Sequence, residues 1–142
     1  MNGNAELLNY IYQNSQMGTT TIGQLLDIVE GSDFRSQMSS QYNEYKEIND
    51  EAKRLLNENG FDEKGINAFD RIRTYLMINM KTLTDKSSSN IAEMMIIGSN
   101  MGVIEAIRSL KKYKDANPEI LGLMERLKAF EENNITSLKA YL

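Results

Sequence analysis

Apolar residues recur three and four positions apart along most of the chain, the spacing that places them on one face of an α-helix. The stretch from about 33 to 59 shows this best, because its apolar positions alternate strictly between steps of four and three. Such spacing is typical of helices that pack nearly aligned in a bundle. The pattern predicts helices at about 4–30, 33–59, 66–83 and 90–115, and a last helix that starts at Pro118.

Polar residues stand where three of these helices should begin. Asn4, Ser32 and Asn117 are expected N-caps, because their side-chain oxygens can accept hydrogen bonds from the first free backbone N–H groups. Gly31 and Gly60 follow the first two helices and should end them. With one proline in 142 residues and few alternating β-branched runs, the chain is predicted to be all-α.

The lengths of the connections predict how the helices are arranged. Short links join the first helix to the second and the fourth to the fifth, so each pair should form an antiparallel hairpin. The link between these hairpins is about 30 residues long and contains the helix at 66–83. If that helix runs back along the bundle, its two long neighbours in the sequence become parallel. The expected fold is a four-helix bundle over residues 1–142, as one domain, with a long crossover that contains an extra helix.

The composition argues against several classes of function. Sixteen basic and 20 acidic residues give a net charge of −4, which is unlike a nucleic-acid binder. The absence of Cys and His excludes disulfides, thiol chemistry and imidazole-based catalysis. No apolar run approaches the roughly 20 residues of a membrane span, and residues 1–30 show no signal-peptide pattern. We therefore expect a cytoplasmic protein that binds neither nucleic acid nor membrane.

A short pattern of small residues repeats within the chain. Ser15 and Gly18 recur as Ser99 and Gly102, 84 residues later. Two related hairpins are what a bundle with pseudo-two-fold symmetry needs. The small residues predict close approach of helices, and room for a small ligand is the alternative. A serine nucleophile would lack a base, so hydrolase chemistry is not expected.

Polar residues also interrupt two of the apolar seams. Gln41 lies in the seam of the second helix, and Glu131 and Asn134 lie in that of the last. Gln41 and Glu131 match at a separation of 90 residues, and an apolar residue follows each by seven positions. A buried Glu131 would need partners, which we expect to be Gln41, Asn134 or a tyrosine hydroxyl. Gln41 alone would more often set the register of a bundle than perform chemistry.

With these polar pairs the chain resembles the ferritin-like superfamily. In its metal-binding members, two helices each supply one Glu and the other two each supply Glu-x-x-His. The six corresponding positions in this chain are Ser15, Gln41, Glu44, Ser99, Glu131 and Asn134, with Gln16 and Asn100 as alternatives to the two serines. Only two of the six keep a carboxylate and none is a histidine, which is too few anionic ligands for a di-metal centre. The resemblance therefore implies the fold, with vestigial ligand positions and no cofactor.

The leading prediction is a non-catalytic protein with a binding or structural role and a polar core in place of the metal site. Metal-free members of the superfamily include bacterial coat-associated proteins, so the resemblance admits such structural roles. One alternative is a weak metal-binding or oxidase-like protein that uses Glu44 and Glu131. The other is a small-ligand binder that uses a polar layer between Ser15, Gln41, Ser99 and Asn134.

The helix at 66–83 carries more apolar residues than one buried stripe requires. Tyr75, Met77 and Ile78 lie outside its main stripe. A helix that packs on two sides would explain them, and the second side could be a contact with another copy of the chain. We therefore expect a homo-oligomer, most simply a homodimer.

Overall fold

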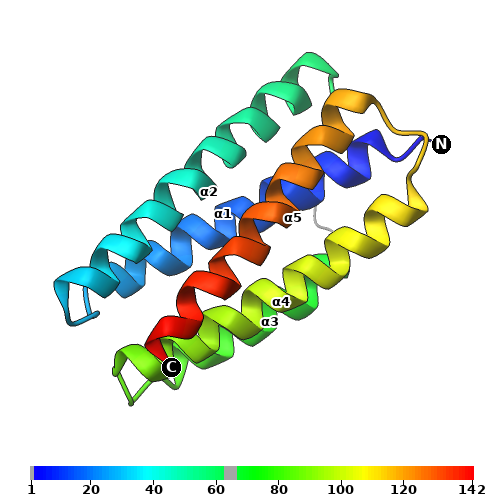
Figure 1. Ribbon diagram of the computed structural model, residues 1–142. Helices are drawn as coiled ribbons and strands as arrows, with labels where there is room; N and C mark the ends of the chain where they lie inside the picture. The colour runs from blue at the N-terminus through cyan, green and yellow to red at the C-terminus, as the bar shows by residue number, and fades with distance from the viewer. Residues whose placement is uncertain (1, 63–66) are drawn as a thin grey trace.

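The structure, a computed structural model, describes residues 2–62 and 67–142 and contains five α-helices and one short 3-10 helix in those ranges (Figure 1). The helices are α1 (Asn4–Leu26), α2 (Ser32–Glu58), α3 (Asn67–Lys81), α4 (Ser88–Lys112), α5 (Pro118–Leu138) and η1 (Lys139–Tyr141). The prediction of an all-α bundle is confirmed.

The four long helices are arranged as two antiparallel hairpins (Figure 1). The closest packing is between α1 and α2 and between α4 and α5, the pairs joined by short links. The shorter α3 runs back along the bundle, so that α2 and α4 point the same way (Figure 1). The predicted long crossover with its extra helix is therefore present.

Helix α3 covers the side of the bundle between α1 and α4, since it packs against both. Phe69, Ile72 and Leu76 form its buried face. Leu76 lies so close to Gly98 on α4 that a Cβ atom there would be 3.0 Å from its Cδ2. The missing side chain lets α3 sit tightly on α4, and the bundle centre is closed on this side.

Buried apolar side chains from all five helices fill one continuous core. Tyr10, Phe34 and Phe69 are among the largest of them, and each is almost fully buried. Burial of this apolar surface is the main force that holds the helices together. The aromatic rings also contact one another, as Tyr10 and Phe69 do edge to face at 6.1 Å.

The predicted ends of α1 and α4 extend too far, and that of α3 extends two residues beyond its observed end at Lys81. Helix α1 ends at Leu26, not near 30, and the guanidinium group of Arg35 donates hydrogen bonds to the carbonyls of Leu26 and Val29. Arg35 thereby gives these two carbonyl oxygens the hydrogen bonds that a longer α1 would have provided. This stabilises the turn after Leu26, which the apolar periodicity did not predict. Helix α4 likewise ends at Lys112, three residues short of the prediction.

The expected caps are partly confirmed. Asn117 caps α5, because its side chain accepts a hydrogen bond from the backbone N–H of Glu119 at 2.9 Å. Asn4 and Ser32 are instead the first helical residues, and the cap positions belong to Gly3 and Gly31. Both glycines have positive φ, which residues with a side chain rarely adopt. The predicted start of the third helix at 66 lies outside the described residues.

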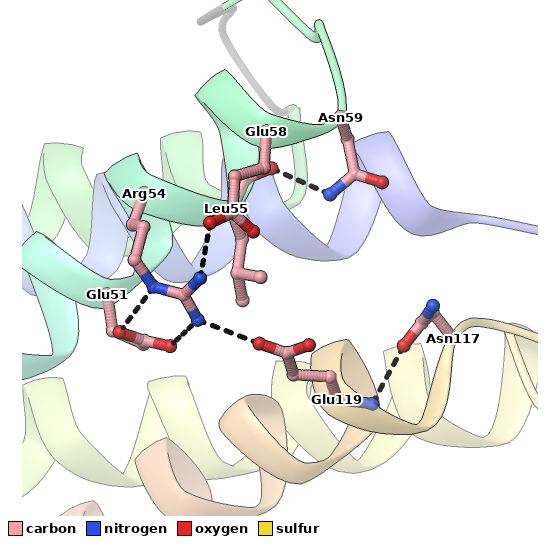
Figure 2. Close-up of polar contacts among 7 residues, drawn as sticks. All are labelled: Glu51, Arg54, Leu55, Glu58, Asn59, Asn117 and Glu119. Carbon is pink, nitrogen blue, oxygen red and sulfur yellow. Dashed lines mark hydrogen bonds and ion pairs between the residues drawn. The ribbon is translucent and has the colours of Figure 1, made fainter.

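A cluster of ion pairs ties α2 to α5 at the end of the bundle that holds the α4–α5 link (Figure 2). Arg54 on α2 donates to Glu51 and Glu58 on its own helix and, at 2.8 Å, to Glu119 on α5. These carboxylates raise the pKa of the Arg54 guanidinium. All four side chains are well exposed, so the cluster orients the two helices with little effect on stability.

Candidate functional site

Among the described residues, Glu131 on α5 is the one acidic residue whose side chain is buried, with 2% of its surface exposed. Asn14 on α1 donates its amide Nδ2–H to Oε1 of Glu131 at 3.0 Å. Tyr45 on α2 donates its hydroxyl to Oε2 at 2.9 Å. Both carboxylate oxygens therefore have a neutral partner, each from a different helix.

The hydrogen bonds continue from Glu131 to α4, the one long helix not yet included. The Nδ2 group of Asn14 also donates to the hydroxyl oxygen of Tyr10, at 3.2 Å. The hydroxyl of Tyr10 in turn donates to the backbone carbonyl of Gly102 on α4, at 3.0 Å. We call these five residues, Tyr10, Asn14, Tyr45, Gly102 and Glu131, the Glu131 network. It joins α1, α2, α4 and α5 at one level of the bundle.

Two glycines make room for the side chains of this network. A Cβ atom on Gly102 would lie 2.4 Å from Oε1 of Glu131, and one on Gly18 would lie 2.6 Å from the ring of Tyr45. The repeated small residues therefore leave space for large side chains of the partner helix, rather than for close contact between backbones. Sequence alone could not separate these two uses of a glycine.

The glycine contacts also correct the predicted alignment of the two hairpins. Tyr45 lies against Gly18 in the first hairpin as Glu131 lies against Gly102 in the second. Helices α4 and α5 begin 84 and 86 residues after α1 and α2. The structural counterpart of Glu131 is therefore Tyr45, not Gln41, because the second helices of the two hairpins are offset by 86 residues and not by 90.

Burial changes the acidity of the network. Loss of contact with water raises the pKa of Glu131 to about 8, and the hydrogen bonds from Tyr45 and Asn14 oppose this rise. Burial and the nearby Glu131 carboxylate also raise the pKa values of Tyr10 and Tyr45 well above their usual range. Both phenols therefore remain neutral donors. The carboxyl group of Glu131, by contrast, titrates near pH 8, within the pH range of ordinary experiments.

A cavity of about 20 Å³ lies beside the carboxylate and is lined by residues of all five helices. Its polar lining residues are Asn14, Thr21, Tyr45, Ser99 and Glu131. Leu76 is among the α3 residues that close it from the side. Since a water molecule needs roughly 10–15 Å³ of such volume, the cavity has room for one particle of that size.

Four buried side-chain atoms have no hydrogen-bond partner among the described residues, and one of them belongs to the cavity-lining residue Thr21. They are Oγ1 of Thr21, Nε2 and Oε1 of Gln41, and Nδ2 of Asn134. Each residue lies one helical turn from the Glu131 level, as counted from Gly18 on α1, Tyr45 on α2 and Glu131 itself on α5. The antiparallel course of these helices makes the three turns point the same way, so the residues form a second polar layer, here called the Gln41 layer.

Two of the other predicted ligand positions also lie in the bundle interior. Ser99 is buried on α4 and lines the cavity, and its hydrogen bond with Tyr45 partly opposes the rise in the pKa of that phenol that burial causes. Ser15 is buried too, but its hydroxyl donates to the carbonyl of Ile11 at 2.7 Å and accepts from Asn49 at 3.1 Å. Ser15 therefore fastens α1 to α2 and has no hydrogen bond to the Glu131 network.

Glu44 does not join the other five predicted positions in the interior. Its carboxylate accepts hydrogen bonds from Nε and Nη2 of Arg126 on α5, at 3.1 and 3.2 Å, and its side chain is 31% exposed. The helical turn explains this placement, because one residue of sequence rotates the side chain by about 100°. Tyr45, the next residue, takes the inward direction.

Sequence reasoning missed three members of the Glu131 network. Asn14 precedes the predicted Ser15 by one residue, and Tyr10 and Tyr45 look like ordinary core aromatics in the apolar pattern. A signal did exist, since a buried tyrosine hydroxyl needs a polar partner. The expectation that a tyrosine hydroxyl would hold Glu131 agrees with the position of Tyr45.

In residues 2–62 and 67–142, no three His, Cys, Asp or Glu side chains are grouped so that they could hold a metal ion. Over the same ranges, no helix has the length and apolar character needed to cross a membrane.

Comparison with known proteins identifies a structural relative. No protein-family model matches the chain, and no curated protein matches it significantly. Among solved structures, the chain is similar to the crystal structure of a DUF305 fragment from Deinococcus radiodurans, with a TM-score of 0.77. The similarity covers 96% of this chain and 93% of that chain at 14% sequence identity. At this identity it shows a shared fold alone.

Proposed function

We propose that this protein is a non-catalytic bundle of ferritin-like architecture with a binding or structural role, in which hydrogen-bonded side chains occupy the level where relatives hold metal. The order of the helices and the long crossover support the ferritin-like assignment. The cytoplasmic location expected from the sequence is part of this proposal, and so is a bacterial source, as for the coat-associated members of the superfamily.

The observation that carries this proposal is the state of Glu131. Both of its oxygens accept hydrogen bonds from neutral side chains, those of Asn14 and Tyr45. A carboxylate engaged in this way links helices and fixes their register. Gly102 fits the same role, since its missing side chain provides the space that the carboxylate fills.

The metal-binding alternative has less support. It requires Glu44 and Glu131 to act together, but Glu44 is paired with Arg126 on the bundle surface. Glu131 would then be the only carboxylate of such a centre, and a di-metal pair needs several anionic oxygens. The small-ligand alternative keeps more support, because the cavity and the Gln41 layer lie side by side.

Metal retention tests the proposal directly. The purified chain is incubated with Fe(II) or Mn(II), desalted, and assayed for bound metal and oxygen consumption. We expect no stoichiometric metal and no oxygen uptake. Retention of one or two metal ions per chain, lost in Glu131→Gln while the melting temperature is kept, would establish the metal-binding alternative instead.

We further propose that the chain forms a homodimer through α3 and α4. Most of its strongly exposed large apolar side chains lie on these two helices, namely Met77, Ile78, Ile97, Ile104 and Ile107. An exposed apolar surface of this kind is typical of a protein interface. Light scattering coupled to size exclusion should give twice the chain mass, and Ile97→Glu with Ile104→Glu should give the monomer. A monomeric wild type would remove this part of the proposal.

A further inference from the structure

The buried carboxyl group of Glu131 lacks a cationic partner. Each of its two hydrogen bonds comes from a neutral group, the amide of Asn14 and the phenol of Tyr45. None of the ion pairs among the described residues includes Glu131. A buried negative charge without a positive partner is strongly unfavourable, so the site must take up either a proton or another cation.

The cavity beside Glu131 offers oxygen atoms and little space. Thr21 lines it, and the hydroxyl oxygen of Thr21 is buried without a partner. Ser99 contributes a second hydroxyl to the lining. A volume of about 20 Å³ admits one particle of the size of a water molecule. Oxygen ligands and a negative charge select a hard cation and exclude an anion.

We propose that this cavity binds one sodium-sized monovalent cation, held by the Glu131 carboxylate together with the hydroxyl oxygen of Thr21. A single carboxylate balances a single positive charge, whereas a divalent ion would leave an excess charge buried. The unpartnered Oε1 of Gln41 belongs to the adjoining Gln41 layer and is not part of the cavity lining. The inference rests on the proposed function, since it names a ligand for the polar core of a non-catalytic bundle.

The cation and the proton compete for the same carboxylate. Because burial raises the pKa of Glu131 to about 8, cation binding at neutral pH displaces a proton, and its affinity increases as the pH rises. Tyr10 on α1 and Tyr45 on α2 are the other titratable members of the network. Of the charged groups beyond it, Glu105 on α4 acts on Tyr10, and Arg73 on α3 lies over the ring of Phe69. Both tyrosines stay neutral because their pKa values are raised.

Thermal unfolding of the full chain tests the proposal. The melting temperature is measured at pH 9 and pH 6 in sodium chloride and, at equal ionic strength, in choline chloride, whose cation is too large for the cavity. Sodium should raise the melting temperature by at least about 3 °C at pH 9, because a ligand that binds only the folded state stabilises it. At pH 6 the difference between the two salts should be much smaller.

Three variants separate the site from general salt effects. Glu131→Gln keeps the shape but removes the charge, so its melting temperature should be the same in both salts. Thr21→Val should reduce the sodium effect, while the control Glu44→Gln, which alters a surface carboxylate, should keep it. Equal melting temperatures of the wild type in both salts at pH 9, or a sodium effect that persists in Glu131→Gln, would overturn the proposal. Neither result bears on Fe(II) or Mn(II) retention, which tests the proposed function separately.

Discussion

The hydroxyl group of Tyr45 donates a 2.9 Å hydrogen bond to Glu131, and these two residues occupy equivalent positions in the two hairpins of the bundle. Each lies against a glycine of its hairpin partner, Gly18 for Tyr45 and Gly102 for Glu131. The bond therefore runs across the pseudo-two-fold relation between the hairpins. Because the donor and the acceptor stand at equivalent positions, the first hairpin supplies the hydrogen bond that the buried carboxyl group of the second hairpin needs.

Gly102→Ala should destabilise the fold. The added methyl group would lie 2.4 Å from Oε1 of Glu131, so the buried carboxyl must move away from its hydrogen-bond donors. Overpacking of this kind costs about 1–3 kcal/mol. Urea unfolding measures the effect, and Gly122→Ala on α5 is the control. Nothing lies within 4 Å of that position, so the control should gain up to about 1 kcal/mol from helix propensity. Equal effects of the two substitutions would contradict the packing role of Gly102.

Stability should fall as the pH rises from about 5 to about 9 in choline chloride. The pKa of Glu131 is about 8 in the folded chain against an ordinary 4.5, so the folded state binds this proton more tightly than the unfolded state. The resulting stabilisation is complete below the pKa that Glu131 has in the unfolded chain. It is lost as the pH rises through the pKa that Glu131 has in the folded chain, and the total loss is roughly 2–5 kcal/mol. Unfolding free energies of the wild type and Glu131→Gln measured across this range test the effect. A parallel pH dependence in both proteins would show that Glu131 is not its source.

Tyr45→Phe should cost more at high pH than at low pH. The substitution keeps the ring that packs edge to face on Phe130 at 4.7 Å but removes the donor to Oε2 of Glu131. A hydrogen bond to a charged group is worth about 1.5–3 kcal/mol, and Glu131 is charged only above about pH 8. Tyr42→Phe, at a half-buried position on the same helix, serves as the control. A loss that does not vary with pH would mean that Tyr45 does not stabilise the charged carboxylate.

Gln41→Leu should be neutral or stabilising, by up to about 2 kcal/mol. Both polar atoms of the Gln41 amide are buried without a partner, so an apolar side chain of similar size avoids the cost of removing them from water. Asn14→Leu is the contrasting variant, because it leaves one oxygen of Glu131 without its donor and should destabilise clearly. Chemical denaturation compares the two. Strong destabilisation by Gln41→Leu would show that the amide has partners in solution.

The sequence predicted the elements of this fold better than their contacts. The strict spacing between 33 and 59 placed α2 within one residue at each end, because that helix buries one continuous apolar face. The end of α1 was wrong, since it depends on hydrogen bonds from Arg35, a residue of the next helix. Periodicity describes one helix at a time and cannot include such contacts.

The same limit explains the outcome at the candidate site. Burial of Glu131 could be predicted from its place in an apolar seam, and the structure has it 2% exposed. Its donor Asn14 is 117 positions away in the sequence, and no local pattern connects the two residues. Glu44 is a different case, because its position at the edge of the apolar stripe already favoured a solvated acid, and Tyr45 occupies the inner face.

The position of α3 affects how fast protons or ions can exchange between the centre of the bundle and the solvent. Phe69, Ile72 and Leu76 line the central cavity, and α3 is attached to the rest of the chain only through its two flanking links and its own packing. A particle that reaches Glu131 from this side has to wait until α3 lifts away. If protons or ions reach Glu131 by this route, we expect their exchange rate to depend on how often α3 opens locally, and not on the equilibrium affinity of the site.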